Sequence, residues 1–494
     1  MKFAFIVPPP QYNRMNNPID RVYGCNYGYD YKPPIHMLSA ATVLEREGHA
    51  IRFLDCPAEG WDAARFEAWA REGDFDAAVF FTPYLAEEED KRAAAEIRKH
   101  HGLSKPVIYL GAAPTWKPEN FVSDEATLVV RGEPEMSLIE LAQALEGQGD
   151  LSAVEGIALL RDGTPHLTPT RGLLDIEWLP IPNRRLLLGE YRVNRLDVTP
   201  VTTMCVSRGC QYKCTFCAPN AVDQASEVEH KRVQGSPLPK LPLRLRTSEQ
   251  VIEEFREIHA LGYRGIEVAD NQFVWSKRRT LEICEGIRDL GLKWMCLARA
   301  NHLRDPKVVR ALGEAGCMMV YIGTESFCQA ILDDICKGIQ VEDVKTAVAV
   351  CRECGVEPEV SVMIGGSALE TRETIRHSMR EAKKLGTPFV HYSAVLPFPN
   401  CQFYDQAMEK GWMRHGEFEP VDNAKTSIVN LPHVSAEEME RILRWAYLRQ
   451  YLSPRGIWHQ VRKVRSPADV WYKMKMALKL IRNSFFTRWS EPSR

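Results

Sequence analysis

The sequence predicts an α/β protein with two successive parallel sheets and a helical C-terminal region. Short apolar runs alternate with helical periodicity over residues 1–150, a second such series starts near residue 196, and the alternation ends near residue 408. Strands separated by helices of this length indicate βαβ units. We expect a doubly wound, Rossmann-like domain over 1–150, a linker over 151–195, a partial (β/α)6 TIM-type barrel over 196–408 and helices over 409–494.

The first series contains five candidate strands with helical patterns between them. The strands are expected at 3–7, 51–54, 77–81, 107–110 and 127–130, and the helices at 35–47, 61–71, 87–100 and 137–145. In doubly wound sheets, ligands bind at the carboxyl ends of the strands. The loops that follow these strands are therefore the places to look for a binding site.

The second series contains six candidate strands, too few for a closed eight-stranded barrel. They are expected at 202–207, 265–269, 294–298, 318–322, 359–363 and 389–395, with helices such as 248–261 and 277–290 between them. As in closed barrels, we expect chemistry where the strands end. After residue 408 the pattern indicates helices, among them 436–451 and 468–482.

Composition restricts the class of function. The chain has 494 residues, and 63 Lys plus Arg against 65 Asp plus Glu give a formal net charge of −2, so nothing favours nucleic-acid binding. No run approaches the roughly 20 apolar residues of a membrane span, and the apolar start is too short for a signal peptide. The 14 scattered cysteines fit reduced thiols better than a disulfide scaffold. We expect a cytoplasmic protein.

Three cysteines differ from the rest in their spacing. Cys210, Cys214 and Cys217 form a C-x3-C-x2-C pattern after the first strand of the second series, with Gly209 before them. Cysteine thiolates are the usual ligands of iron–sulfur clusters, and three thiolates leave one iron of a 4Fe–4S cluster open for chemistry. The alternatives are a zinc site, which normally needs a fourth ligand, or three core cysteines.

The triad, with the aromatic Phe216 inside it, resembles the radical S-adenosylmethionine (SAM) superfamily. The resemblance implies that the open iron of a 4Fe–4S cluster held by Cys210, Cys214 and Cys217 binds SAM, and that Phe216 packs near the adenine. It also implies reductive cleavage of SAM to methionine and a 5′-deoxyadenosyl radical, which abstracts hydrogen from a substrate.

Nearly the whole chain is similar to the radical SAM subgroup that has an N-terminal cobalamin-binding domain. The loop Gly111-Ala-Ala-Pro-Thr115 resembles the loop after that domain's fourth strand, and Arg131-Gly132-Glu133-Pro-Glu135 resembles the loop after its fifth. The resemblance implies that Gly111, Thr115, Gly132 and Glu133 bind cobalamin; the small residues would let the backbone approach a flat corrin closely. Each loop alone could be a routine turn.

The lower face of the cobalt is a further implication of the resemblance. The Asp-x-His-x-x-Gly signature of histidine-ligated cobalamin is absent, so histidine-free binding is expected. Tyr84, in the loop after the third strand, would face that side of the cobalt. A partly buried aromatic residue is an equally good interpretation of Tyr84.

The resemblance also implies SAM-binding residues at the ends of the barrel strands. They are Asp270, Arg299, Glu325 and Gly365, which follow the second, third, fourth and fifth strands. Each could instead be a solvated loop charge or a helix cap. Cys401, in a loop after the sixth strand, could supply a hydrogen or proton, although a core thiol is the more common role of such a residue.

Two cofactors imply a division of labour. The resemblance implies C-methylation of an unactivated carbon through the 5′-deoxyadenosyl radical and methylcobalamin. The alternative is cyclisation or oxidative rearrangement without net methyl transfer, as in anaerobic Mg-protoporphyrin monomethyl ester cyclase-like enzymes. A non-catalytic sensor is disfavoured by the intact triad, and a methylthiotransferase by the lack of a second cysteine trio.

The expected partners are a small-molecule substrate and an electron donor of the reductase, flavodoxin or ferredoxin type. The basic, aromatic stretch 473–489 could contact a membrane or a lipid-like substrate. Packing on the barrel is the more common role of such a stretch.

Overall fold

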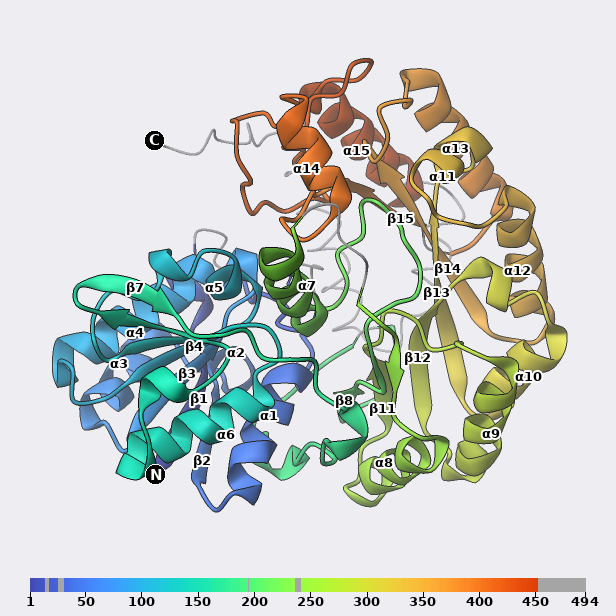
Figure 1. The fold of residues 1–494 in the computed structure, drawn as a ribbon. Helices are drawn as coiled ribbons and strands as arrows, with labels where there is room; N and C mark the ends of the chain where they lie inside the picture. The colour runs from blue at the N-terminus through green and yellow to red at the C-terminus, as the bar shows by residue number, and fades with distance from the viewer. Residues whose placement is uncertain (14–16, 25–30, 194, 236–240, 389, 452–494) are drawn as a thin grey trace.

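The structure is a computed structural model that describes the chain except residues 14–16, 25–30, 194, 236–240, 389 and 452–494. Two parallel sheets lie side by side, the N-terminal one in blue and the second as an arc of green to orange strands (Figure 1). The predicted helix 468–482 and the stretch 473–489 lie outside the described residues.

The first sheet has seven strands in the order β2-β1-β3-β4-β5-β6-β7. Its first five strands are parallel, and each corresponds to a predicted strand. They are β1 (Lys2–Val7), β2 (Ala50–Asp55), β3 (Ala77–Phe81), β4 (Val107–Leu110) and β5 (Thr127–Val130). The intervening helices are α1 (Ile35–Arg46), α2 (Cys56–Glu59), α3 (Ala63–Glu72), α4 (Glu87–His101), α5 (Ala112–Trp116) and α6 (Glu135–Gln143).

Alternation along β1 shows why this sheet is covered on both faces. Phe3 and Phe5 pack with side chains of α1 and α6, whereas Ala4 and Ile6 belong to a cluster with side chains of α3 and α4. Successive strand residues point to opposite faces, so a strand that is apolar at every position needs a helix layer on each side. The domain is doubly wound.

Strand structure continues into residues 151–195, which we expected to be a linker. β6 (Ile157–Arg161) and β7 (Thr164–Leu167) form a hairpin, and β6 pairs antiparallel with β5. The turn residues Asp162 and Gly163 both have positive φ, as a tight two-residue hairpin requires. The first sheet therefore extends beyond residue 150.

The second sheet has six strands in the order β15-β14-β13-β12-β11-β8, all parallel. Each corresponds to a predicted strand: β8 (Val201–Met204), β11 (Gly265–Val268), β12 (Lys293–Ala298), β13 (Cys317–Glu325), β14 (Glu357–Ile364) and β15 (Val390–Ala394). The outer helices are α8 (Ser248–Ala260), α9 (Lys277–Ile287), α10 (Pro306–Glu314), α11 (Gln329–Asp334), α12 (Val341–Glu353) and α13 (Arg372–Leu385). They cover the convex face of the arc (Figure 1).

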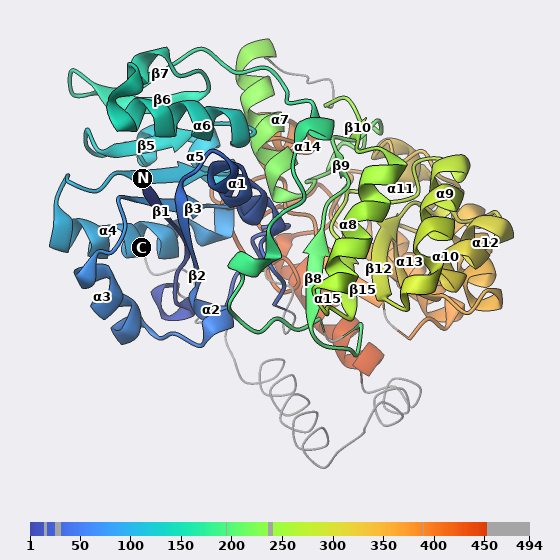
Figure 2. The same ribbon diagram turned by 90° about the horizontal axis from the view of Figure 1, so that it is seen from below.

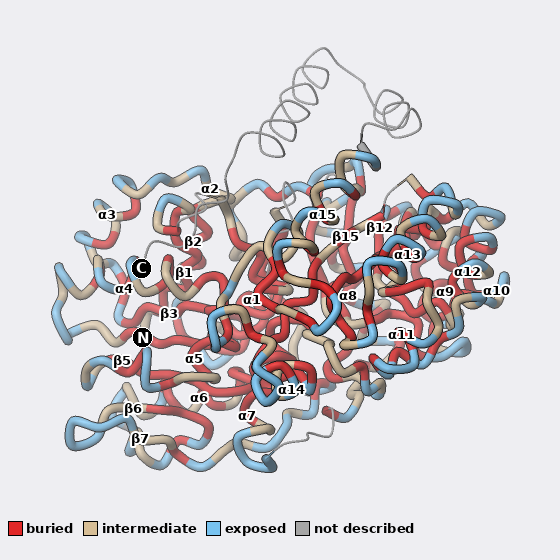
Figure 3. The backbone as a smooth tube through the Cα atoms, turned by 90° about the horizontal axis from the view of Figure 1, so that it is seen from above, coloured by how far each residue is buried: buried red, intermediate tan, exposed pale blue. Residues whose placement is uncertain are grey.

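Between the two sheets lie a short ribbon and one helix. β9 (Ser207–Arg208) pairs antiparallel with β10 (Arg244–Leu245), and α7 (Ala221–Gln234) stands between the sheets in two perpendicular views (Figures 1 and 2). One hydrophobic cluster contains residues of both sheets. The burial-coloured tube shows buried backbone running through both sheets (Figure 3).

The C-terminal part of the described chain is helical, as predicted. α14 (Gln402–Glu409) follows β15, and α15 (Ala436–Tyr451) contacts β15. Met439 and Leu443 of α15 are fully buried. None of the helices in the described ranges has the length and apolar character needed to cross a bilayer.

Candidate active site

The predicted site residues of the second domain gather at one edge of its sheet. Arg299 directly follows β12, Glu325 ends β13 and Gly365 follows β14, while Asp270 lies two residues after β11. The strands are parallel, so these positions share the carboxyl edge, with Val268 opposite Met204 and Ala298 opposite Ile322. The cysteine loop starts from the same edge, after β8 and β9.

The cysteine loop begins with a backbone conformation that only glycine adopts easily. Gly209 has φ +76°, and a Cβ there would lie 2.2 Å from the carbonyl oxygen of Pro242. The Gly209 N–H donates to Oδ2 of Asp223 at 2.9 Å. Beyond the first cysteine, the Cys217 N–H donates to the carbonyl oxygen of Cys214 at 3.3 Å, which folds the last two cysteines into a turn.

The middle of the cysteine loop is bonded to neighbouring loops. The Thr215 N–H donates to the carbonyl oxygen of Ile335 at 3.1 Å, and the Phe403 N–H donates to the Thr215 carbonyl oxygen at 2.8 Å. Ile335 follows α11 and Phe403 lies in α14. Segments from the far side of the arc therefore hold the loop over the carboxyl edge.

The donor set of this loop fits an iron–sulfur cluster. Cys214 is buried, and Cys210 and Cys217 are half-buried. Within the described ranges, no group of three or more His, Cys, Asp or Glu side chains is arranged around a single metal ion. Three thiolates in one loop match the ligands of a 4Fe–4S cluster that keeps one iron open for chemistry.

Arg299 lies against the cysteine loop. Its Nη1 approaches Sγ of Cys214 at 3.8 Å, and its guanidinium carbon lies 3.6 Å from the centre of the Tyr212 ring. Its Nε is buried without a hydrogen-bond partner among the described residues. A buried, incompletely satisfied cation beside a cysteine loop is suited to an anionic ligand such as a carboxylate.

Glu325 forms a buried ion pair that the sequence did not indicate. Oε1 of Glu325 lies 2.8 Å from Nζ of Lys337, with 13% and 9% of the two side chains exposed. Burial lowers the pKa of Lys337, but the attraction of Glu325 and then of Cys214 outweighs it and leaves the pKa raised. Nζ of Lys337 is also 5.8 Å from the centre of the Phe216 ring.

The backbone at Glu325 is strained. Its φ of +66° lies in the left-handed region, which is uncommon for residues other than glycine. Oε2 of Glu325 accepts a hydrogen bond from Oγ of Ser361 at 3.3 Å. Such strain persists only where surrounding structure enforces it, and it concentrates at functional sites.

Asp270 anchors the chain that leads into the cysteine loop. Its Oδ1 accepts from the N–H groups of Val206 at 2.8 Å and Ser207 at 3.2 Å. Burial raises the pKa of Asp270 to about 6, against the effect of these hydrogen bonds. Its Oδ2 has no partner among the described residues, so Asp270 combines an anchoring role with one acceptor to spare.

Gly365 belongs to a loop held by a buried carboxylate. Its N–H donates to Oε2 of Glu370, and a Cβ at Gly365 would lie 2.6 Å from Sδ of Met439 in α15. Burial raises the pKa of Glu370 to about 8, although backbone hydrogen bonds from Gly365 and Gly366 lower it. The loop therefore has its backbone against α15, where no larger side chain fits.

On the first sheet, the two predicted glycine loops contact each other. Oγ1 of Thr115 donates to the carbonyl oxygen of Gly111 at 2.7 Å and accepts from the N–H of Gly132 at 3.2 Å. Gly111 has φ +101°, and a Cβ there would lie 2.9 Å from the Thr82 carbonyl oxygen. Thr115, which is itself fully buried, thus links the loops after β4 and β5 at the carboxyl edge.

Glu133 is already engaged by protein groups. Its Oε1 lies 2.7 Å from Nη2 of Arg244 and 3.5 Å from Nη1 of Arg208. Its Oε2 accepts from Nη1 of Arg244 at 2.9 Å and from the Leu174 N–H at 2.8 Å. Burial raises the pKa of Glu133, but the two arginines reverse this and leave the pKa lowered. Glu133 therefore serves as an ion-pair partner.

Tyr84 lies in an aromatic cluster between the first sheet and the C-terminal segment. Its ring centre is 5.1 Å from that of Phe418, 5.5 Å from Phe398 and 5.8 Å from Trp116. Only 2% of Tyr84 is exposed, and its hydroxyl has no partner among the described residues. A cavity of about 240 Å³ lies beside it. A buried hydroxyl without a protein partner fits contact with a bound group.

Cys401 lies close to this cluster. It is buried at the start of α14, and a negative charge on its thiol would raise the pKa of Tyr84. Its surroundings include Phe398 and Phe403 of the main hydrophobic cluster. These neighbours fit a core thiol, the more common role expected for it.

The sequence of the second domain decides the family. The profile of the Radical SAM superfamily matches residues 204–382, which contain the cysteine triad and the carboxyl edge from β11 to β14. Residues 204–382 therefore carry a radical SAM domain. The protein is a radical SAM enzyme, and this domain implies a 4Fe–4S cluster and SAM, the two cofactors predicted from the triad.

Relatives and a solved structure extend the likeness along the whole chain. An uncharacterized methyltransferase of Pyrococcus horikoshii is 28% identical over 92% of this chain and 93% of its own. The anaerobic magnesium-protoporphyrin IX monomethyl ester cyclase of Rubrivivax gelatinosus is 26% identical over 57% of this chain and 49% of its own. The cobalamin-dependent radical SAM enzyme OxsB, solved with aqua-cobalamin and SAM, aligns with TM-score 0.70 over 98% of this chain and 71% of its own, at 15% identity. The fold is therefore that of a cobalamin-dependent radical SAM enzyme.

Proposed function

We propose that this radical SAM enzyme is a cobalamin-dependent C-methyltransferase that acts on an unactivated carbon of a small-molecule intermediate. The observation that carries the proposal is that the segment leading into the cysteine loop contacts the carboxyl edge of the first sheet: Arg208 forms ion pairs with Glu133 and Glu135. The methyltransferase of Pyrococcus horikoshii, similar over nearly its full length, supports this choice.

In this proposal the cysteine loop holds the cluster and the carboxyl edge holds SAM. Cys210, Cys214 and Cys217 supply thiolates to three irons, and Phe216 packs beside the adenine. The SAM methionine carries a carboxylate and an ammonium group, which match Arg299 and Glu325 in charge. A reduced cluster held there would supply the electron for cleavage of SAM into methionine and a 5′-deoxyadenosyl radical, which would take a hydrogen atom from the substrate carbon.

Two further residues shape the SAM subsite. Asp270 fixes the chain before the cysteine loop through two backbone hydrogen bonds, and its second oxygen has no partner among the described residues. Gly365 brings backbone close to the site because its own loop is held by Glu370. Both residues act mainly by fixing backbone, which orients SAM against the cysteine loop.

Cobalamin would occupy the carboxyl edge of the first sheet. Gly111, Thr115 and Gly132 would keep these loops free of large side chains where a flat macrocycle approaches the backbone. Tyr84 would face the cobalt with a phenol that is not a strong metal ligand, and burial keeps the pKa of that phenol well above its ordinary value. Bound there, cobalamin supplies a methyl group that SAM has donated. Glu133 takes part indirectly, through the ion pairs that fix its loop.

Cofactor and product analysis tests the proposal. Anaerobically reconstituted protein is expected to hold about four irons and one cobalamin per chain. With reductant and SAM it is expected to release both S-adenosylhomocysteine and 5′-deoxyadenosine. A preparation that binds iron and cleaves SAM but rejects cobalamin would rule out the methyltransferase function and leave the radical SAM assignment standing.

Cyclisation or oxidative rearrangement without net methyl transfer is the second candidate. It is favoured by the similarity to the cyclase of Rubrivivax gelatinosus, although the alignment spans about half of that protein. The same residues would bind cluster, SAM and cobalamin. The two candidates differ in one product, because the cyclase function predicts 5′-deoxyadenosine without S-adenosylhomocysteine.

A further inference from the structure

The cysteine loop leaves a ribbon that carries two arginines side by side. Arg208 in β9 and Arg244 in β10 are directly opposite each other in the antiparallel pair. Like charges in this arrangement repel and destabilise a ribbon. Only 5% of the Arg208 side chain and 15% of the Arg244 side chain are exposed, so water does not relieve the repulsion. The ribbon therefore needs anions from elsewhere.

Those anions come from the loop after β5 of the first sheet and from the first residue of α6. Arg208 binds both oxygens of Glu135, through Nη1 at 3.2 Å and through Nη2. Arg244 binds both oxygens of Glu133, at 2.7 and 2.9 Å. The Glu135 side chain is fully buried. Paired fork-to-fork geometry of this kind fixes distance and orientation together.

The other end of the cysteine loop is attached to the same domain. α7 follows the loop, and its Glu229 lies 2.5 Å from Nη1 of Arg131, two residues before Glu133. Arg232, also in α7, donates to the carbonyl oxygens of Thr115 and, at 3.1 Å, of Trp116. Thus β9, before the cysteines, and α7, after them, are both bonded to the first domain at the segments that follow β4 and β5.

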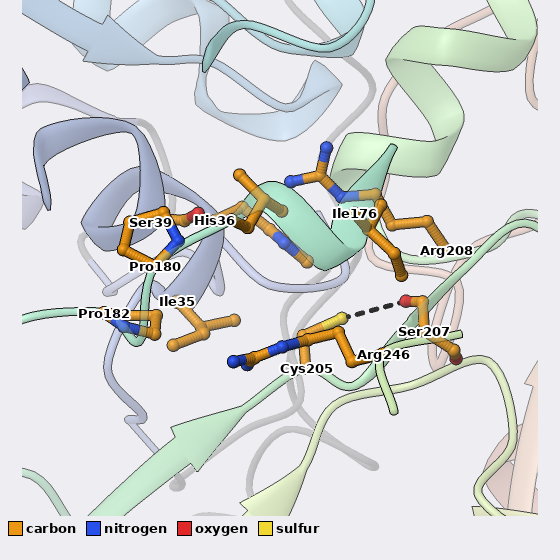
Figure 4. A pocket seen from close by; sticks show the side chains of 11 residues that line it. Ile35, His36, Ser39, Ile176, Pro180, Pro182, Cys205, Ser207, Arg208 and Arg246 are labelled. Carbon is orange, nitrogen blue, oxygen red and sulfur yellow. Dashed lines mark hydrogen bonds between the residues drawn. The ribbon is translucent and has the colours of Figure 1, made fainter. Parts of the chain in front are cut away.

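A small cavity marks how closely the two domains fit here. It has a volume of about 30 Å³, room for one water, and lies between α1, the segment around Pro180 and the residues Cys205 to Arg208. Figure 4 shows His36 and Ser39 of α1 on one side of it and Cys205, Ser207 and Arg208 on the other. Burial, with the nearby Arg208, lowers the pKa of His36 to about 3, so it adds no charge to the interface.

We propose that Arg131, Glu133 and Glu135, with Arg208, Arg244 and Glu229, form an interdomain clasp that sets the separation between the cysteine loop and the loops after β4 and β5. The clasp contains three cations and three anions, so it is neutral and matched. Its members are positioning residues. The inference rests on the proposed function, because a fixed separation matters only if the second edge carries a reacting group.

Ion pairs suit this interface because the cysteine loop must not shift relative to the first domain. A hydrophobic interface would also join the domains, but buried ion pairs with bidentate geometry tolerate little displacement. A shift of about 1 Å between reacting groups can cost about 100-fold in rate. Methyl transfer from SAM to cobalamin at the first edge would depend on the separation between the cysteine loop and the loops after β4 and β5. Reductive cleavage of SAM at the cysteine loop does not.

Two products of one SAM site therefore test the clasp. In Glu135→Gln, loaded with cluster and cobalamin, the ratio of S-adenosylhomocysteine to 5′-deoxyadenosine is expected to fall about 100-fold, with 5′-deoxyadenosine still formed. Arg208→Lys keeps the charge but loses the fork, and it is the second variant should Glu135→Gln fold poorly. A ratio equal to wild type in both variants overturns the inference.

The control is an equally buried carboxylate between two arginines. Glu254 in α8 is fully buried, and its carboxylate lies 2.6 Å from Arg184 and also binds Arg246. Among the described residues it has no hydrogen bond or ion pair to the loop after β5. Glu254→Gln is expected to lower stability while leaving the product ratio unchanged. An equal fall of the ratio in this control would assign the effect to general destabilisation and overturn the inference.

Hydrogen exchange separates failure of the clasp from failure of the proposed function. In protein without cofactors, residues 205–217 are expected to exchange at least tenfold faster in Glu135→Gln than in wild type, and unchanged in Glu254→Gln. Wild-type exchange in Glu135→Gln contradicts the clasp. Wild-type protein that binds no cobalamin contradicts the proposed function, whatever the exchange result.

Discussion

The carboxyl edges of the two sheets use polar side chains in opposite ways. On the first sheet, Arg131, Glu133 and Glu135 are consumed in ion pairs with the second domain. On the second sheet, Asp270 and Arg299 keep buried polar atoms that have no partner among the described residues. Unsatisfied buried groups cost stability and are retained where a ligand satisfies them. This contrast supports the proposal that the first edge serves as a platform and the second as the reactive site.

The largest expected effect breaks the second edge outright. Replacement of Cys210, Cys214 or Cys217 by Ala removes a thiolate that nothing nearby replaces. We expect iron to fall from about four per chain to near zero, and 5′-deoxyadenosine to disappear. Iron assay and product analysis after anaerobic reconstitution provide the measurement.

Cys354→Ser is the control for the triad. Cys354 lies after α12, and its thiol donates to the Pro306 carbonyl oxygen at 3.7 Å, away from the carboxyl edge. It is expected to keep wild-type iron and product yields. Formation of 5′-deoxyadenosine by any triad variant would contradict the assignment of the cluster.

The next effect concerns the Glu325–Lys337 ion pair, where the free energy of unfolding and the affinity for SAM are expected to respond differently. Lys337→Met leaves Glu325 as a buried, unpaired charge and is expected to cost about 3–5 kcal/mol of unfolding free energy. Glu325→Gln together with Lys337→Met removes both charges and should recover most of that loss. SAM affinity should nevertheless stay reduced in the double variant, because Glu325 is the residue proposed to bind the ammonium group of SAM.

Unfolding in urea and equilibrium dialysis with SAM measure these two quantities. Lys345→Met, which removes an exposed lysine 3.3 Å from Glu342, is the control and should change neither. Recovery of SAM affinity along with stability in the double variant would mean that the pair is structural only.

The sequence predicts the architecture well because each buried strand is recognisable from its own short apolar run. All eleven predicted strands of the two series exist as parallel strands, and their carboxyl ends bring Arg299 and Glu325 to the edge that the strand-end rule indicates. The hairpin β6–β7 was not expected because its strands are short and polar on one side. Alternation of apolar and polar residues over only four positions is weak evidence for a strand.

Partner choice could not be predicted from the sequence. Lys337 reaches Glu325 only because α11 reverses the chain between them, and Glu133 meets Arg244 across 111 residues. Charge and spacing in the motif around Glu133 are compatible with ligand binding or with an ion pair. Only the fold supplies the arginines that decide between these roles.

An effect of intermediate size is the pH dependence of stability that Glu370 gives to the loop around Gly365, at the second edge. The pKa of Glu370 is about 8 in the folded protein and about 4.3 in an unfolded chain. Because the folded state binds the proton more tightly, Glu370 stabilises the fold fully below pH 4 and loses this contribution as pH rises to 8. Each pKa unit corresponds to about 1.4 kcal/mol.

Glu370→Gln removes this titration. The stability of wild type relative to Glu370→Gln should fall steadily from pH 5 to pH 8 in urea titrations. Glu373→Gln, three residues further along in the first turn of α13, is the control and should follow wild type. A difference between wild type and Glu370→Gln that is constant over this range would mean that Glu370 is ionised in the fold.

The smallest effect concerns Tyr84, which follows β3 at the first edge. Tyr84→Phe removes a buried hydroxyl without a partner among the described residues and should stabilise the cofactor-free protein by about 1 kcal/mol. Tyr191→Phe is the matched control: Tyr191 is also buried, but its hydroxyl donates to Asp55 at 2.9 Å, so its loss should destabilise. Thermal unfolding with and without cobalamin then gives the decisive comparison. If the Tyr84 hydroxyl faces bound cobalamin, the added cofactor should stabilise wild type more than Tyr84→Phe, and equal stabilisation would make Tyr84 a purely structural aromatic residue.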